Sequence, residues 1–169
     1  QKDLKQIVIF NIVISLGVMV CGTATLNTFG VKGALFYAVN DILLKAALFI
    51  VVGLIIYVSG VKYLQKCGLI NKYPLLGWTY FIIVLSLAGV PPFSGFYGKA
   101  LIIKGLVTNN NTFIAILVAL SGLVVFYSLI RIFLNVFYDN INKSLTLKPL
   151  PKGVQIPLIA IVAIALIIG

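Results

Sequence analysis

The sequence Gly89-Val90-Pro91-Pro92-Phe93-Ser94-Gly95-Phe96-Tyr97-Gly98-Lys99 lies in the middle of an apolar segment that runs from about residue 75 to residue 107. One crossing of a bilayer takes about 20 residues, so this segment is long enough for one. Neither proline can continue a helix, because each lacks an N–H donor and its ring clashes with a carbonyl one turn earlier. We therefore predict a membrane helix that is broken at Pro91-Pro92. Lipid cannot satisfy the freed backbone groups, so the break is expected to face protein or a water-filled cavity.

Lys99 follows the break by about one turn and is therefore a cation near the membrane centre. Broken helices with an ionisable residue beside the break form ion sites in many transporters. We expect Lys99 to lie on a proton or ion pathway, with Ser94 at the break as a secondary candidate. The positive end of the helix that begins after the prolines is expected to disfavour protonation of Lys99.

The composition is that of an integral membrane protein. Hydrophobic residues make up 62% of the chain and charged residues only 9%, whereas a soluble domain averages about 25% charged residues. The chain begins at Gln1 rather than Met and ends within an apolar run. We therefore expect it to be an internal piece of a longer polytopic protein.

Five transmembrane helices are predicted in an all-α fold, at about residues 4–23, 31–59, 75–107 (broken), 113–138 and 156–169 (truncated). If these helices alternate in direction, one side of the membrane receives eight lysines: Lys2, Lys5, Lys62, Lys66, Lys72, Lys143, Lys148 and Lys152. The other side receives Lys32 and Lys104. An excess of lysine marks the cytoplasmic side, so the N-terminal end of the chain is expected there. This topology requires the broken segment to cross once.

The net charge of +10 would suit a nucleic-acid partner, but the basic residues are scattered through short loops. We expect these residues to set topology and predict no nucleic-acid binding. The chain has no histidine, and Cys21 and Cys67 lack the spacing of metal ligands. We therefore expect neither a metal nor a cofactor in this chain.

The second segment contains Asn40, Asp41 and Lys45. Asp41 and Lys45 are four residues apart, which places them on one helix face, and the carboxylate precedes the lysine as favourable pairing requires. An unpaired lysine at the membrane centre costs roughly 2.5–3.5 kcal/mol on insertion scales, so we predict an inward-facing ion pair. Its role is either that of a proton relay or that of a structural pair, and Asn40 is a secondary candidate.

Two further polar faces have alternative interpretations. Asn11 and Ser15 share a face of the first segment, which favours hydrogen bonding between helices over an ion pathway. Arg131 lies near the end of the fourth segment. Its side chain could extend to the membrane interface, or it could be a functional residue; it is a secondary candidate.

Three stretches resemble a known family: Gln1-Lys2-Asp3-Leu4-Lys5, residues 40–49 (NDILLKAALF) and residues 87–99 (LAGVPPFSGFYGK). They are similar to the antiporter-like subunits shared by Mrp-type multisubunit Na⁺/H⁺ antiporters and respiratory complex I, and most of all to the D-type subunits of the antiporters. The resemblance covers nearly the whole chain, and the proline motif with its trailing lysine is the most specific part. It implies two inverted five-helix repeats, of which this chain would be the second.

The resemblance also implies roles for individual residues. Lys99 matches the lysine on the second broken helix, at the outlet of a half-channel, and Lys45 matches the lysine of the central axis. Asp41 stands where several relatives have a histidine, so we expect it to tune Lys45 or to touch a cation. The implied partners are other subunits of a hetero-oligomeric antiporter complex in the bacterial cell membrane, the lipid bilayer, and H⁺ and Na⁺ as transported ions.

Three functions remain open from the sequence. The first is a proton-translocating subunit of a cation/proton antiporter, which is not an enzyme. The second is a proton-pumping subunit in the membrane arm of an NADH:quinone oxidoreductase. The third is a structural membrane subunit whose charges only orient helices.

Overall fold

The computed structural model of the chain describes residues 3–60 and 68–138, together with residues 149, 153, 160, 162 and 163. The elements assigned over these residues are all helices: α1 (Leu4–Thr23), α2 (Thr28–Ser59), the 3₁₀ helix η1 (Leu69–Asn71), α3 (Pro74–Ala88), α4 (Ser94–Thr108), α5 (Thr112–Phe133) and the π-helix η2 (Leu134–Tyr138). The predicted all-α fold is confirmed. The predicted fifth segment, 156–169, lies almost wholly outside the described residues.

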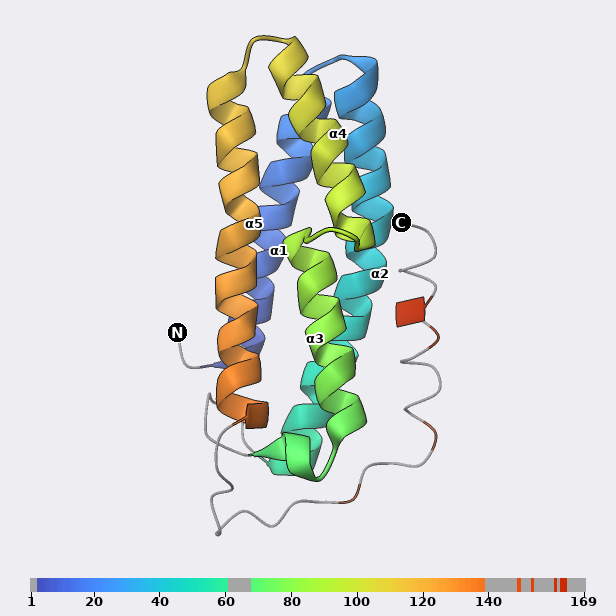
Figure 1. The fold of residues 1–169 in the computed structure, drawn as a ribbon, viewed down its shortest axis with the longest axis vertical. Helices are drawn as coiled ribbons and strands as arrows, with labels where there is room; N and C mark the ends of the chain where they lie inside the picture. The colour runs from blue at the N-terminus through green and yellow to red at the C-terminus, as the bar shows by residue number, and fades with distance from the viewer. Residues whose placement is uncertain are drawn as a thin grey trace.

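Three helical stretches are long and apolar enough to span a membrane. They are α1, α2 and the continuous stretch from α5 through η2, with mean hydropathies of 2.1, 2.5 and 2.6. Helices α3 and α4 have 15 residues each, about 22 Å at 1.5 Å per residue, which is shorter than the roughly 30 Å hydrocarbon core. Figure 1 shows α4 continuing from the end of α3 in the same direction. The two helices therefore share a single crossing, as the lysine pattern required.

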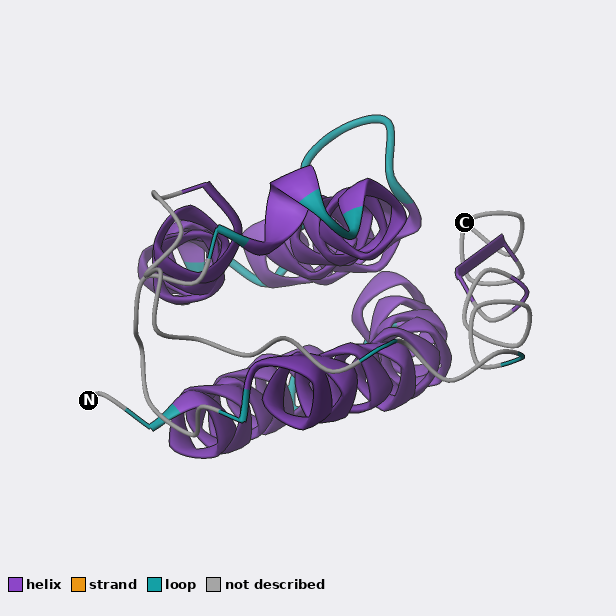
Figure 2. Cartoon of the chain, turned by 90° about the horizontal axis from the view of Figure 1, so that it is seen from below, coloured by secondary structure: helices purple, strands orange, loops and turns teal. Residues whose placement is uncertain are grey.

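The helices form two layers (Figure 2). One layer contains α1 and α2, and the other contains α5 beside the α3–α4 crossing. Contacts of α4 with α2 and of α5 with α1 join the layers. The interior between them is where a polar side chain can be shielded from lipid.

Side-chain caps set the starts of the first two helices. The Asp3 carboxylate accepts a hydrogen bond from the Lys5 N–H at 3.0 Å, so this acid caps α1. Helix α2 begins at Thr28, earlier than predicted, because Asn27 Oδ1 accepts a hydrogen bond from the Gly30 N–H at 2.7 Å. Asparagine is among the preferred N-cap residues.

The break between α3 and α4 falls at the two prolines, as predicted. Helix α3 ends at Ala88 and is capped by Gly89, whose φ of 80° lies in the left-handed region that residues with a side chain disfavour. Pro91 and Pro92 follow, and α4 begins at Ser94. A Cβ at Gly95 would lie 1.8 Å from the Ser86 carbonyl oxygen. The start of α4 therefore packs directly on the backbone at the end of α3.

Glycines allow α4 to approach α2 closely. A Cβ at Gly98 would lie 2.7 Å from Tyr37 Cβ, and one at Gly33 would lie 2.8 Å from the Ile102 nitrogen. Small residues permit such approaches between membrane helices, where van der Waals packing stabilises association. This packing fixes the position of α4 along the axis of α2, and hence the position of Lys99 relative to Tyr37.

Candidate functional site

The predicted pair of Asp41 and Lys45 forms within α2. Lys45 Nζ lies 2.5 Å from Asp41 Oδ2. Asp41 is 4% exposed and Lys45 is 8% exposed, so both charges face the interior. The four-residue spacing predicted this contact, and pairing offsets part of the cost of burying each charge.

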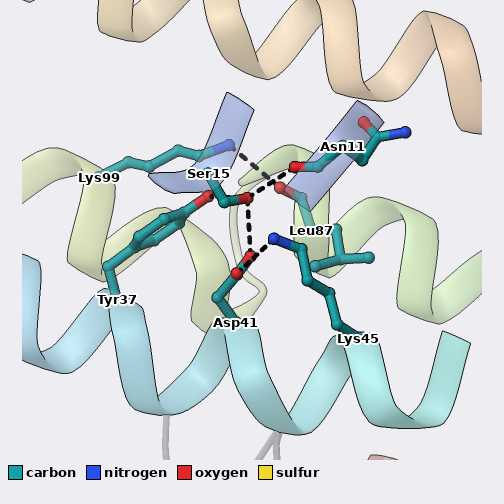
Figure 3. Close-up of polar contacts among 7 residues, drawn as sticks. All are labelled: Asn11, Ser15, Tyr37, Asp41, Lys45, Leu87 and Lys99. Carbon is teal, nitrogen blue, oxygen red and sulfur yellow. Dashed lines mark hydrogen bonds and ion pairs between the residues drawn. The ribbon is translucent and has the colours of Figure 1, made fainter. Parts of the chain in front are cut away.

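Ser15 and Tyr37 complete the surroundings of Asp41 (Figure 3). Ser15 Oγ, from α1, donates to Asp41 Oδ1 at 3.0 Å, and Tyr37 OH donates to Ser15 Oγ at 3.2 Å. Sequence reasoning assigned Ser15 to helix packing and missed Tyr37. A signal for Tyr37 was present, since it precedes Asp41 by four residues and shares its helix face.

Lys99 is 5% exposed, and its amine is held at the end of the broken helix. Nζ donates to the carbonyl oxygens of Leu87 and Ala88 at 3.0 and 2.9 Å. The last carbonyls of a helix have no partner within it and carry its negative partial charge. The long side chain carries the amine back to the last carbonyls of α3, so the amine lies at the end of α3 rather than at the first N–H groups of α4.

Tyr37 connects the two parts of the site. Lys99 Nζ lies 5.7 Å from the centre of the Tyr37 ring, while the hydroxyl of the same side chain bonds Ser15. Figure 3 shows the tyrosine between the amine and the Asp41 carboxylate. The structure thus brings Lys45, Asp41 and Lys99 into one cluster with two amines and one carboxylate.

The secondary candidates lie in two different places. Ser94 Oγ donates to Asn40 Oδ1 at 3.0 Å, which ties the first residue of α4 to α2 beside the cluster. Arg131 is exposed in the last turn of α5 and lies outside the cluster. Its position agrees with the interpretation of a side chain that extends to the membrane interface.

A cavity of about 530 Å³ adjoins Lys99. Its wall is formed by the end of α3, one face of α4 and part of α5; its lining residues are Ala88, Gly89, Phe96, Lys99, Ala100, Ile103, Lys104, Val107, Thr108 and Ala119. It extends along α4 from Lys99 to Thr108, the last residue of the helix. The break therefore faces both protein and a cavity large enough for several waters.

A family model described as NADH:quinone oxidoreductase/Mrp antiporter, TM, matches residues 1–125. The chain belongs to this family. It is 39% identical over 172 residues to a D-type Na⁺/H⁺ antiporter subunit of Bacillus subtilis strain 168, covering 99% of this chain and 34% of that protein. The chain thus spans about a third of the length of this relative.

Two solved assemblies contain chains with the same fold. A chain of the Mrp complex from Dietzia sp. DQ12-45-1b matches with a TM-score of 0.91 and 20% identity, over 98% of this chain and 39% of that one. A chain of respiratory complex I from Thermus thermophilus with bound NADH matches with a TM-score of 0.87 and 22% identity, over 98% of this chain and 35% of that one. Both matches cover nearly the whole chain, so they support its helical fold.

Proposed function

We propose that this chain is the proton-translocating part of a subunit of a multisubunit Na⁺/H⁺ antiporter. The observation that carries the proposal is the Lys99 amine, which is buried at a helix break, held by two carbonyls and adjacent to a 530 Å³ cavity. The Bacillus subtilis relative, which is named as a Na⁺/H⁺ antiporter subunit, and the fold shared with a chain of an Mrp complex support this assignment.

The chemistry proposed for the cluster is transfer of a proton between amines. The cluster contains two amines and one carboxylate, and of the two amines only that of Lys45 contacts Asp41. Loss of a proton from either amine therefore leaves the cluster with no net charge. Asp41 holds Lys45 and can hold it less tightly when another cation approaches the carboxylate. Lys99 exchanges its proton with water in the cavity. Because Nζ lies over the Tyr37 ring and not at its hydroxyl, transfer between the pair and Lys99 requires a bridging water.

The proposal includes the setting of the protein. The subunit would work with other subunits of a hetero-oligomeric complex in the bacterial cell membrane, with the start of α1 on the cytoplasmic side. It would be a transporter component and not an enzyme. The rival assignment, a subunit of an NADH:quinone oxidoreductase, rests on the complex I match. The purified partners separate the two: flavin and iron–sulfur proteins would indicate the oxidoreductase, and small membrane subunits would indicate the antiporter.

The test of this function is Lys99→Ala in the full-length protein within the assembled complex. We expect Na⁺/H⁺ exchange in vesicles to be lost at normal expression. The matched control is Lys32→Ala, which removes an exposed amine from α2, away from the cavity. Exchange at the rate of the unmodified complex in Lys99→Ala would remove Lys99 from the mechanism.

A further inference from the structure

The last turn of α3 has four carbonyls that the helix itself cannot satisfy, and each of them has a partner. The carbonyls of Leu85 and Ser86 accept hydrogen bonds from backbone N–H groups just after the helix, both at 3.1 Å. The carbonyls of Leu87 and Ala88 accept from Lys99 Nζ at 3.0 and 2.9 Å. The end of α3 is therefore capped in part by its own backbone and in part by a side chain of α4.

The bonds of Lys99 join the two halves of the broken helix. Lys99 belongs to α4, so each of its two bonds crosses the break and returns to α3. Helix α5 packs directly on this contact, since a Cβ at Gly122 would lie 2.7 Å from the Ala88 oxygen and 3.5 Å from Lys99 Nζ. The amine is thus enclosed where α3, α4 and α5 meet, and it is the group that bonds α4 to the end of α3.

The strength of this contact depends on the charge of the amine. An ammonium group has three N–H groups and makes charge-assisted hydrogen bonds, which are roughly twice as strong as neutral ones. A neutral amine has two N–H groups and makes only the weaker bonds. Loss of one proton from Lys99 therefore weakens both bonds across the break at once.

The cavity beside Lys99 gives the two halves room to move. Ala88, Gly89 and Lys99 all line it, so the end of α3 and the side chain that caps it both border open space. Helices bend most readily where their backbone hydrogen bonding is interrupted, and the prolines interrupt it here. A weaker contact at Lys99 can therefore change the angle between α3 and α4 without first breaking a continuous helix.

The other charged groups around this amine come from α2 and from α4 itself. The Tyr37 ring lies 5.7 Å from Lys99 Nζ, and hydrogen bonds lead from its hydroxyl to Asp41, which pairs with Lys45. Lys104 lines the same cavity from α4. At this contact α3 presents backbone carbonyls and α5 presents a glycine. A test by pH must therefore separate Lys99 from the groups on α2 and α4.

We infer that Lys99 is a protonation-dependent clamp between the two halves of the broken helix. With the amine charged, α4 is held against the end of α3. With the amine neutral, the clamp loosens and the angle between α3 and α4 changes. The inference rests on the proposed function and deepens it, because the proton that is transported also sets the geometry of the helix that carries it.

The test is the distance between two spin labels on either side of the break, measured by pulsed electron paramagnetic resonance in the full-length complex. The labels are attached to Trp78→Cys in α3 and Val107→Cys in α4, which are exposed positions. Cys21 and Cys67 are replaced by serine in the same chain. We expect the distribution of distances in this labelled parent to shift as the pH is raised and Lys99 loses its proton.

Two substitutions fix the charge at position 99. Lys99→Met removes the donor at similar length and should show the high-pH distribution at every pH. Lys99→Arg keeps a permanent cation with N–H donors, and should show the low-pH distribution at every pH. The arginine variant decides the question if the methionine variant assembles poorly. The control is Lys32→Ala, which removes an exposed amine from α2 and should keep the pH-dependent shift of the parent.

A distribution that stays the same at every pH in the labelled parent would overturn the inference. A shift with pH that persists in Lys99→Arg or Lys99→Met would also overturn it, because another group would then cause the shift. Either result would leave the loss of exchange in Lys99→Ala, and hence the proposed function, untouched. Conversely, a clamp that follows pH in a complex whose exchange survives Lys99→Ala would refute the proposed function and leave the clamp in place.

Discussion

Gly95→Ala should separate the two halves of the broken helix and release Lys99. The added Cβ would lie 1.8 Å from the Ser86 carbonyl oxygen, whereas even close carbon–oxygen contacts in proteins are about 3.3–3.6 Å. The backbones of α3 and α4 must therefore move apart by about 1.5 Å. Both partners of this contact are backbone groups, so a change of side-chain rotamer cannot relieve it.

The loss of stability in Gly95→Ala follows from the hydrogen bonds that such a movement would stretch. Lys99 Nζ donates to the Leu87 and Ala88 carbonyls at 3.0 and 2.9 Å, and a further 1.5 Å would exceed hydrogen-bonding distance. A hydrogen bond to a charged group contributes about 1.5–3 kcal/mol. The flexible lysine side chain can stay bonded to one of the two carbonyls. We therefore expect Gly95→Ala to lower the free energy of unfolding by about 3 kcal/mol.

The assay is thermal unfolding of the purified full-length complex together with Na⁺/H⁺ exchange in vesicles. Gly95→Ala should lower the melting temperature and abolish exchange. The control is Gly53→Ala in α2, where an added Cβ meets nothing within 4 Å and should be neutral or slightly stabilising. A Gly95→Ala complex that is as stable and active as the parent would show that the close contact of α3 and α4 does not position Lys99.

Three further predictions concern other contacts. Asp41→Asn or Lys45→Met alone should lower the free energy of unfolding of the complex by about 3–5 kcal/mol, because a buried charge loses its partner. The double variant should recover this stability but not Na⁺/H⁺ exchange. A double variant with normal exchange would favour the structural role of the pair. Gly122→Ala should slow exchange, since its Cβ would lie 2.7 Å from the Ala88 oxygen that binds Lys99; equal rates in the variant and the parent would refute this. Asn27→Ala should lower the free energy of unfolding by about 1–3 kcal/mol, because the Asn27 amide both caps α2 and bonds the Gly105 carbonyl at 2.7 Å. An unchanged free energy of unfolding would refute this prediction.

Much of the fold was predictable because its signals are local in the sequence. The double proline determines the break, and the spacing of Asp41 and Lys45 determines their pairing. Asp3 likewise lies where an acid favours the first helical turn. Each of these depends on covalent geometry or on the period of a single helix.

The parts that were missed depend on how helices pack against one another. The period of one helix cannot say that Ser15 of α1 faces Asp41 of α2, because this depends on the relative height and rotation of the two helices. The partners of Lys99 were missed for a similar reason. Its distance from the start of α4 was predictable, but the direction of its long side chain, toward the end of α3, depends on the close approach at Gly95.

The most direct test of the proposed proton pathway is whether the Lys99 amine gains and loses a proton in the working complex. Nitrogen NMR of the full-length complex with isotope-labelled lysine can follow this, and the Lys99→Arg variant identifies the signal by its absence. We expect one lysine signal to change between the ammonium and the neutral amine positions across the pH range of Na⁺/H⁺ exchange. A signal that stays at the ammonium position throughout that range would contradict it.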